Sequence, residues 1–519
     1  MRVIRKSLAG TLLLCLCFGA GAREFSGIDP AARETLLGSA LWLHSSNSAG
    51  LALDSLGRMS SLSLEAFHEQ GGLKSVWSGE RENDIRVAVD GITEAGGMTL
   101  YGDFSYDYIS QSGVEYNASL YEPSYDQPYF VADYSVSDWK KQAYDMGFRA
   151  ASPLFWNGRA AFGFEVRYKA LVGAKQIDPR TETFRYDISL APSVAVRLGE
   201  HSSLGLGLEY LHSFERSRPS VENDWVTPRV AIMRGLGFYT AGTAGGNLGF
   251  DIFYYKKDQF GASLQYMLDS GSADLLVDAG ASYSVTPVTE NPELPRMRGR
   301  TEKLAFSLKV LGNFGEKKNH RIRLSADWGS TSGYEYNQQL DNSPGASRWV
   351  TVSNPLMSTY DILEAGASYV WYAGLDGAGD YDFKAGADAD MFLMMQEYVV
   401  PLSRFNAVNA AAHVFAGWNL RLGAGRLLPS LSVGYRVSPS GEYLYSGSSN
   451  SDSVIVTDMY PSELRFLTAD RLESDAGVTW AFGIGDTSTL SVRLAGGYDH
   501  SFSIGEHRLR ANLGIQYLF

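Results

Sequence analysis

Apolar and polar residues alternate at the end of the chain. Every odd position from Leu509 to Phe519 is apolar, and most even positions are polar, namely Arg508, Arg510, Asn512 and Gln516. A strand with one apolar and one polar face separates a nonpolar phase from a polar one. The pattern predicts an outer-membrane β-strand, although a soluble β-sandwich can also end in such a strand.

The same alternation recurs along the chain. In segment 381–393, apolar Phe383, Ala385, Ala387, Ala389 and Met391 oppose Asp382, Lys384, Asp388 and Asp390. Similar segments are 162–168, 204–210, 260–268, 275–285, 304–310, 322–328, 363–375, 408–422, 431–437 and the stretch from 490. Each approaches the roughly ten residues that a tilted membrane-crossing strand needs.

The connections alternate between short and long. Turn-type sequences lie at 199–202, 269–272, 313–318, 376–380, 423–425 and 485–488. Longer connections rich in Ser, Asn, Asp, Pro and Tyr lie near 110–140, 214–228, 287–300, 334–360 and 438–469. The sequence therefore predicts an all-β, antiparallel up-and-down transmembrane barrel of about 20 strands, roughly 18 to 22. The number of strands is ambiguous by about two, chiefly in segment 228–268 and before residue 97.

Aromatic residues fall near both ends of the expected strands. Trp371, Trp418, Trp480 and Tyr517 lie toward the short turns, and Tyr283, Trp328, Tyr435 and Tyr498 lie toward the long loops. Transmembrane barrels carry such aromatic girdles at each interface. The alternative, core aromatics of a soluble sandwich or propeller, would need a polar outer face.

The start of the chain reads as a secretory signal peptide. Arg2, Arg5 and Lys6 precede an apolar stretch and the small residues 20–22, so we expect cleavage before Arg23. The expected division is a signal peptide at 1–22, an N-terminal segment at 23–59 and the barrel at 60–519. Both cysteines lie within 1–22, which excludes cysteine redox chemistry from the mature chain.

Charge and hydropathy narrow the class of protein. The 45 basic residues fall to 42 without Arg2, Arg5 and Lys6, against 58 acidic residues, so the mature net charge is about −16. Nucleic acid is an unexpected partner for such a chain. After the signal no run of apolar residues suits a membrane helix, so a membrane location requires a closed barrel. We expect the outer membrane of a Gram-negative bacterium.

The chain terminus has a second implication. Phe519, with Tyr517 two positions earlier, resembles the C-terminal signal that the bacterial barrel-assembly machinery recognises. The resemblance implies that machinery and outer-membrane lipid as partners. The chain as a whole also resembles the large uncharacterised outer-membrane barrels of gut-type anaerobes.

The N-terminal segment does not alternate. Asp29 and Pro30 suit the N-cap and first turn of a short helix. The segment 45–52 that follows resembles the Asn-Pro-Ala-Gly-Leu-Ala stretch of long-chain fatty-acid transporter barrels, but has Ser48 in place of proline. That resemblance implies a plug or hatch through which hydrophobic substrates pass, and it gives candidate gate residues Trp42, Asn47, Gly50 and Leu51.

The polar face of the strands predicts the lining of the lumen. The leading candidates are Arg167, Glu364, Asp382, Lys384, Asp388, Asp390, Arg421, Arg436, Arg493, Arg508 and Arg510. Such a mixed lining suits a water-filled channel or ion pairs that brace a plugged barrel. A barrel of this width is too wide for side chains alone to fill.

Catalysis and metal binding find little support. Asp499 and His500 form an adjacent acid and imidazole, but neighbouring strand residues point to opposite faces. Met391, Met394 and Met395 suit packing or lipid contact better than a soft metal. We expect no enzyme activity and no cofactor.

Three functions stay open. The first is passive transport of an unknown solute through a porin-like channel. The second is uptake of hydrophobic compounds, with an apolar pocket near Trp42, Leu43 and Leu51. The third is a surface-binding or structural barrel, accessory to an uptake system, that acts through the tyrosine-rich loops 116–134 and 443–460.

Overall fold

The computed structural model describes residues 29–54, 56–223, 225–244, 252–291, 294–343, 347–423, 425–485 and 487–519. The predicted signal peptide and its cleavage before Arg23 lie outside these residues. Within them, no helix is both long and apolar enough to span a membrane.

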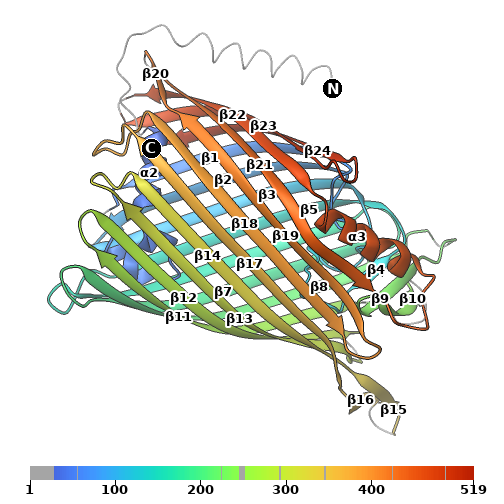
Figure 1. The fold of residues 1–519 in the computed structure, drawn as a ribbon. Coiled ribbons are helices and arrows are strands. Elements are labelled where there is room, and N and C mark those ends of the chain that lie inside the picture. Colours follow the sequence, from blue (N-terminus) through green and yellow to red (C-terminus); the bar gives the residue numbers. More distant parts are fainter. Residues whose placement is uncertain are drawn as a thin grey trace.

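Eighteen antiparallel strands close into a barrel (Figure 1). They are β1 (Met59–Gly71), β2 (Arg81–Ala95), β3 (Met98–Val114), β5 (Ser137–Ala151), β6 (Ala160–Lys175), β7 (Arg180–Arg197), β8 (Ser202–Ser220), β11 (Phe253–Asp269), β12 (Ala273–Glu290), β13 (Arg296–Phe314), β14 (His320–Glu335), β17 (Leu356–Ala373), β18 (Phe383–Tyr398), β19 (Ser403–Trp418), β21 (Gly425–Leu444), β22 (Arg471–Ile484), β23 (Ser488–His500) and β24 (His507–Leu518). Pairing of β1 with β24, for example Leu62 with Tyr517, closes the ring. A short strand, β20 (Leu420–Leu422), pairs with β21 alone.

The expected number of about 20 strands was therefore too high. Strands β9 (Arg229–Gly235) and β10 (Phe238–Thr243) fall in the ambiguous interval and form a separate sheet with β4 (Val131–Asp133). Val230, Ala231 and Ile232 are buried among the long loops instead of facing outward. Their apolar character thus reflects loop packing.

The short turns coincide with the predicted ones and gather at one end of the barrel. The opposite end carries the long loops, including η3 (Ile455–Met459), α3 (Tyr460–Leu467) and the hairpin of β15 (Asn337–Asp341) and β16 (Arg348–Ser353) (Figure 1). The strands are longer than the ten residues expected. β13 has 19 residues and β21 has 20, so parts of the predicted loops 287–300 and 438–469 are strand.

The outer surface of the strands is apolar, as the alternation requires. On β11, Phe260, Leu264 and Leu268 are 64%, 51% and 41% exposed, whereas Gln265 between them is buried toward the lumen. The same alternation continues around the ring, with Leu206 on β8 and Phe306 on β13 facing outward. A closed ring with an apolar outside and a polar inside is the arrangement that hydrocarbon permits.

The N-terminal segment lies inside the barrel near the short turns (Figure 1). It comprises α2 (Pro30–Ser39), η1 (Trp42–His44) and η2 (Ser48–Ala52). The predicted helix start is confirmed, because the Asp29 carboxylate accepts a hydrogen bond from the Ala31 amide and Pro30 occupies the first turn. Residues 29–54 are called the plug below.

Two adjacent residues of β14 test which face meets lipid. Leu324 is 44% exposed on the outer face, and Ser325 faces the lumen. We expect Leu324→Arg to lower the free energy of unfolding from lipid vesicles by about 2 to 4 kcal/mol, because it places a charge in hydrocarbon. Ser325→Arg serves as the control and should change it little. Urea titration in vesicles measures both, and equal losses would contradict the assignment of faces.

Candidate functional site

The plug packs against a ring of small and aliphatic side chains on the barrel wall. Trp42 is 2% exposed and forms a cluster with plug residues Leu41 and Ala49 and wall residues Ala161, Ala195, Leu276 and Leu311. Gly50 lies against the Trp42 indole, where a Cβ would come within 2.1 Å of the ring. Leu51 is fully buried. Trp42 and Leu51 are therefore buried by packing against the plug and the wall.

Asn47 joins the plug to two strands. Its amide nitrogen donates to the Val194 carbonyl at 3.0 Å and to Gln265 Oε1 at 2.8 Å, while its Oδ1 accepts from the Gly50 amide. The neighbouring Ser46 amide donates to Asp278 at 2.8 Å. Asn47 thus caps η2 and anchors it to β7 and β11.

Wall arginines hold the backbone of the plug. Arg149 donates to the Leu43 carbonyl at 2.7 Å, the Ser45 carbonyl at 3.0 Å and Ser48 Oγ at 3.0 Å. Arg321 and Arg323 each donate to a carbonyl of α2 at 2.6 Å, those of Thr35 and Gly38 respectively. The Gly38, Leu43 and Ser45 carbonyls lie at ends of short helices, where partners within the helix are missing.

Ion pairs fix the beginning of the plug to the short-turn end of the barrel. Asp29 pairs with Arg426 at 2.9 Å, Glu34 pairs with Lys384 at 2.5 Å, and Arg33 pairs with Asp90. The plug is therefore attached to β2, β18 and β21 as well as to β5, β7, β11 and β14. Its contacts span most of the circumference of the barrel.

A polar chamber of about 1200 Å³ lies above the plug. Leu43, Ser45 and Ser46 form its floor, and loop residues 120–127 line its opposite side. Several of the inward positions at this height are small, which leaves space between the larger charged side chains. The small residues that line the chamber are Ala191, Gly261, Gly280, Ser282, Ala305 and Gly329.

The roof of the chamber is tied to the wall and to α3. The Tyr125 hydroxyl donates to Glu463 at 2.5 Å, and the same carboxylate accepts from the Val76 amide at 2.9 Å. Asp126 pairs with Lys303 at 2.6 Å, and the Tyr121 amide donates to Glu215 at 2.7 Å. Burial raises the pKa of Glu463. The plug and the loop 120–127 thus bound the chamber on opposite sides, and both are tied to the wall.

A family model described as a family of unknown function, DUF6850, matches residues 48–519. The chain belongs to this family. No curated protein matches the sequence.

The DUF6850 barrel also has distant likenesses among solved structures. The ferric preacinetobactin receptor BauA of Acinetobacter baumannii is 8% identical, with a TM-score of 0.39 over 90% of this chain and 80% of that one. The outer membrane transporter YddB of Escherichia coli is 10% identical, with a TM-score of 0.39 over 88% and 81%. A Pseudomonas aeruginosa FadL homologue is 10% identical, with a TM-score of 0.32 over 96% and 95%. These values are too low to carry an argument about the DUF6850 barrel.

The likeness of residues 45–52 to the fatty-acid transporters is not shown at the level of sequence. The family assignment itself names no substrate. The contacts inside the lumen are therefore the basis for any statement about function.

The predicted lumen residues separate into distinct groups. Arg167 lines the chamber and pairs with Asp103 at 3.1 Å and Asp145 at 2.8 Å. Glu364 lines both the chamber and a smaller cavity of about 470 Å³ beside it. Lys384 contacts the plug. Asp388 lies on the inward row of β18, two positions from Asp390, which joins an inward ion-pair network. Arg493 lies on the inward row of β23, two positions from the buried Ser491.

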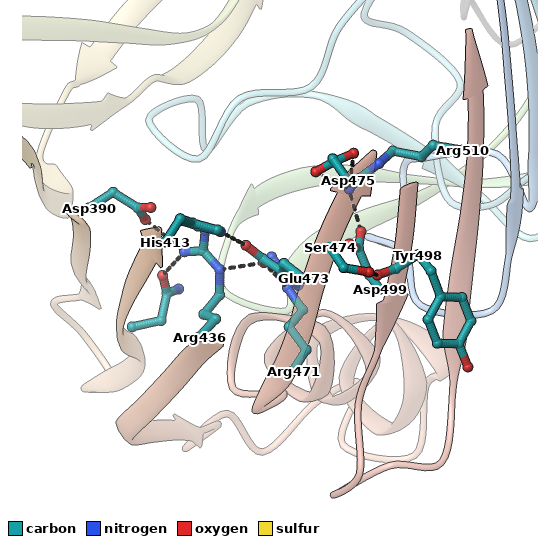
Figure 2. A network of polar contacts seen from close by, with 11 residues as sticks. Asp390, His413, Arg436, Arg471, Glu473, Ser474, Asp475, Tyr498, Asp499 and Arg510 are labelled. Carbon is teal, nitrogen blue, oxygen red and sulfur yellow. Dashed lines mark hydrogen bonds and ion pairs between the residues drawn. The ribbon is translucent and has the colours of Figure 1, made fainter. Parts of the chain in front are cut away.

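Ion-pair networks brace the wall beside the smaller cavity (Figure 2). Glu473 accepts from Arg436 at 3.0 Å and Arg471 at 2.7 Å, and its other oxygen lies 2.7 Å from His413 Nε2. Arg436 also pairs with Asp390 at 2.9 Å. These contacts join β18, β19, β21 and β22 across the inner face of the sheet.

The remaining predicted arginines pair elsewhere. Arg510 bridges Asp475 and Asp499, as Figure 2 shows, and Arg508 pairs with Glu69 at 2.8 Å. Arg421 pairs with Asp380 at 3.1 Å and lies 3.8 Å from Asp382. Arg421 and Asp382 are 61% and 69% exposed at the short-turn end, away from the chamber.

The predicted girdle residues lie on the outer face. Trp371, Phe383 and Trp418 are neighbours on β17, β18 and β19 near the short turns, with successive ring centroids 6.3 and 5.3 Å apart. Trp480 is exposed on β22, and Tyr517 stacks on Phe519 at 5.4 Å. Toward the long loops, Trp328 stacks on Phe306, and the other exposed aromatics are Tyr283, Tyr435 and Tyr498.

The residues weighed for chemistry do not form a site. Asp499 joins the Arg510 network, whereas His500 packs on Tyr498 and Phe502 on the other face. Met394 is buried, while Met391 and Met395 are exposed on the opposite face of β18. Across the described ranges, no group of three or more His, Cys, Asp or Glu residues is placed to hold a metal ion.

Three plug residues have shifted pKa values, and burial raises the pKa of the first, Asp29. Burial raises the pKa of Asp54 to about 7, although its carboxylate accepts from the Leu43 amide. Burial, together with Arg323, lowers the pKa of His44 to about 4. Each of these two shifts favours the neutral form of the side chain in the seated plug. Seating therefore costs free energy at any pH where the side chain is charged in the released plug.

The Asp54 shift predicts a plug that loosens as pH rises. The seated form has the higher pKa, so stability present at low pH is lost as pH rises toward the seated-state pKa near 7. We expect hydrogen exchange of residues 42–54, corrected for intrinsic rates, to accelerate several-fold between pH 6.5 and 8. Asp54→Asn should lack this acceleration, and a variant that keeps it would refute the role of Asp54.

Proposed function

We propose that the protein is an integral outer-membrane barrel that moves a polar solute through a gated lumen. The apolar outer face and the two rows of exposed aromatics support the membrane location. The predicted signal peptide supports export. Transport, and not catalysis, is the proposed activity.

One observation carries the proposal: the polar chamber is closed toward the short turns by a separate plug. The plug adds no strand to the barrel and contacts the wall through side chains, so it can leave without breaking strand pairing. Because the plug lies across the lumen on one side of the chamber and the loop 120–127 lies on the other, this arrangement favours a gated path over a permanently open channel.

The lining favours a polar solute over a hydrophobic one. Carboxylates, arginines and lysines alternate with hydroxyls around the chamber, for example Glu209, Lys257 and Ser263. Trp42 and Leu51 would form the pocket of a fatty-acid-type transporter, but both side chains are buried against the plug and the wall. A hydrophobic compound would have to desolvate charged groups to enter.

A surface-binding role receives less support. Several tyrosines of the two candidate loops pack against each other and the wall, although Tyr134 is exposed. Tyr129 and Tyr460 are 2% and 6% exposed, and Tyr443 stacks on Tyr460 at 5.0 Å. These rings serve to close the lumen, so few of them are available to an external partner.

Planar-bilayer conductance tests the gated path. We expect the purified mature protein to be nearly silent and a variant lacking residues 23–52 to pass current, because the plug fills the lumen beside the short turns. The matched control is Leu324→Ala on the outer face, which should behave like the intact protein.

Each conductance result decides something. Steady current through the intact protein would favour a permanently open channel. Silence of a correctly folded plug deletion, judged by heat-dependent gel mobility, would refute transport through this lumen in favour of a binding or structural barrel.

The end of the chain is proposed as the assembly signal. Phe519 is 51% exposed, and its ring stacks on Tyr517, so the Phe519 ring is accessible to an external partner. We expect Phe519→Ala to reduce the amount of heat-modifiable barrel in membranes several-fold. It should change the unfolding free energy of the refolded protein by no more than about 1 kcal/mol. Leu509→Ala on the same strand is the control. Normal assembly of Phe519→Ala would refute the signal.

A further inference from the structure

Arg149 joins the plug directly to the chamber. Its guanidinium makes three hydrogen bonds to the plug, at Leu43, Ser45 and Ser48, and lies 3.3 Å from Glu165 Oε2. Arg149 and Glu165 face each other on β5 and β6, and both line the chamber. Glu165 Oε2 also accepts from the plug residue Ser48 at 3.4 Å, so both members of this ion pair contact the plug and border the solute space.

The chamber carries more unpaired carboxylates than unpaired cations. Among the described lining residues, Arg149, Arg167, Arg185 and Lys303 each have a carboxylate partner. Lys257 forms no ion pair. The lining carboxylates that form none are more numerous: Glu122, Glu209, Asp327 and Glu364. Asp327 and Glu364 lie directly opposite each other on β14 and β17, so their charges repel.

The surroundings of Glu165 leave room for a ligand. Ala191 faces Glu165 across β6 and β7, and its small side chain leaves open the space between Glu165 and Glu209 on β8. On another part of the chamber wall, on β14, a lining group also lacks a partner. Thr331 is 3% exposed, and its hydroxyl makes no hydrogen bond within the described structure. A buried hydroxyl without a partner on a chamber wall is a group that a polar ligand satisfies.

We propose that the chamber binds a cationic solute, such as one bearing amines, at Glu165 and Glu209, and that binding releases the plug through Arg149. This proposal rests on the gated function proposed above. A cation at Glu165 competes with Arg149 for the carboxylate and repels its guanidinium. Arg149 then loses its electrostatic partner and its hold on the Leu43 and Ser45 carbonyls weakens.

The coupling must act in both directions. If a cation in the chamber weakens the seated plug, then a seated plug lowers affinity for the cation by the same factor. The solute therefore binds more tightly to the form with a released plug, which is the requirement for a ligand to shift that equilibrium.

Hydrogen exchange of residues 42–54 in the intact mature protein tests the coupling, with spermidine as the probe. We expect saturating spermidine to accelerate exchange there about tenfold, within the usual range of coupling between sites, and to leave β21 to β23 unchanged. Magnesium chloride at matched ionic strength controls for screening. No acceleration by spermidine, or the same acceleration by magnesium, would overturn the proposal.

Variants locate the coupling in the ion pair. Glu165→Gln should exchange faster at the plug than the parent without spermidine, because Arg149 has lost its ion-pair partner, and should lose most of the further response to spermidine. Arg149→Lys should exchange rapidly without spermidine and gain little from it. The matched control is Asp475→Asn, an inward carboxylate outside the chamber that pairs with Arg510, and it should respond like the parent.

The exchange and conductance results can be told apart. A conducting plug deletion combined with no spermidine response in the intact protein would overturn the coupling and leave gated transport standing. Spermidine-dependent exchange in a protein whose plug deletion does not conduct would overturn transport and retain a cation-binding barrel. A full response from folded Glu165→Gln would overturn the assigned site.

Discussion

The structure depends on the need to pair every backbone polar group where the chain meets hydrocarbon. Closing the ring through β1 and β24 meets that need, and it fixes a barrel of eighteen strands. A ring of this size is wider than its own inward side chains can fill. The plug and the inward-folded loops are consequences of that width, because each buries apolar side chains that would otherwise face water, such as Trp42 on one side and Tyr129 on the other.

The plug is fastened in a different way from the wall. Wall strands share backbone ladders, whereas the plug is held by side chains that reach its carbonyls, above all those of Arg149, Arg321 and Arg323. Charge-assisted bonds of this kind are strong individually but can be exchanged one at a time. A segment fixed in this manner can separate while the barrel stays intact, which is the mechanical condition for a gate.

The sequence predicted the periodic features well because strand periodicity is local. Leu264 and Gln265 already show which face meets lipid, and Asp29 with Pro30 already marks the start of α2. The strand number failed at β9 and β10, whose apolar residues pack on loops, since alternation does not identify the burying partner. The pairing of Tyr125 with Glu463, and of Arg149 with Leu43 and Ser45, joins residues far apart in sequence. Nothing in the local pattern distinguishes such residues from other inward polar ones.

The chamber lies between the plug and the loop 120–127, at a height where several inward side chains are small. Gly261, Ala305 and Gly329 remove volume at the height where the floor ends and the roof has not begun. The distribution of charge then gives the space its character. Beside the smaller cavity, Glu473 is satisfied by three cationic or potentially cationic partners, whereas Asp327 and Glu364 in the chamber face each other. A positive group that enters the chamber lowers the repulsion between these carboxylates and finds hydrogen-bond acceptors already in place. The carboxylates of the empty chamber therefore lack the electrostatic stabilisation that Glu473 already has in the wall beside it.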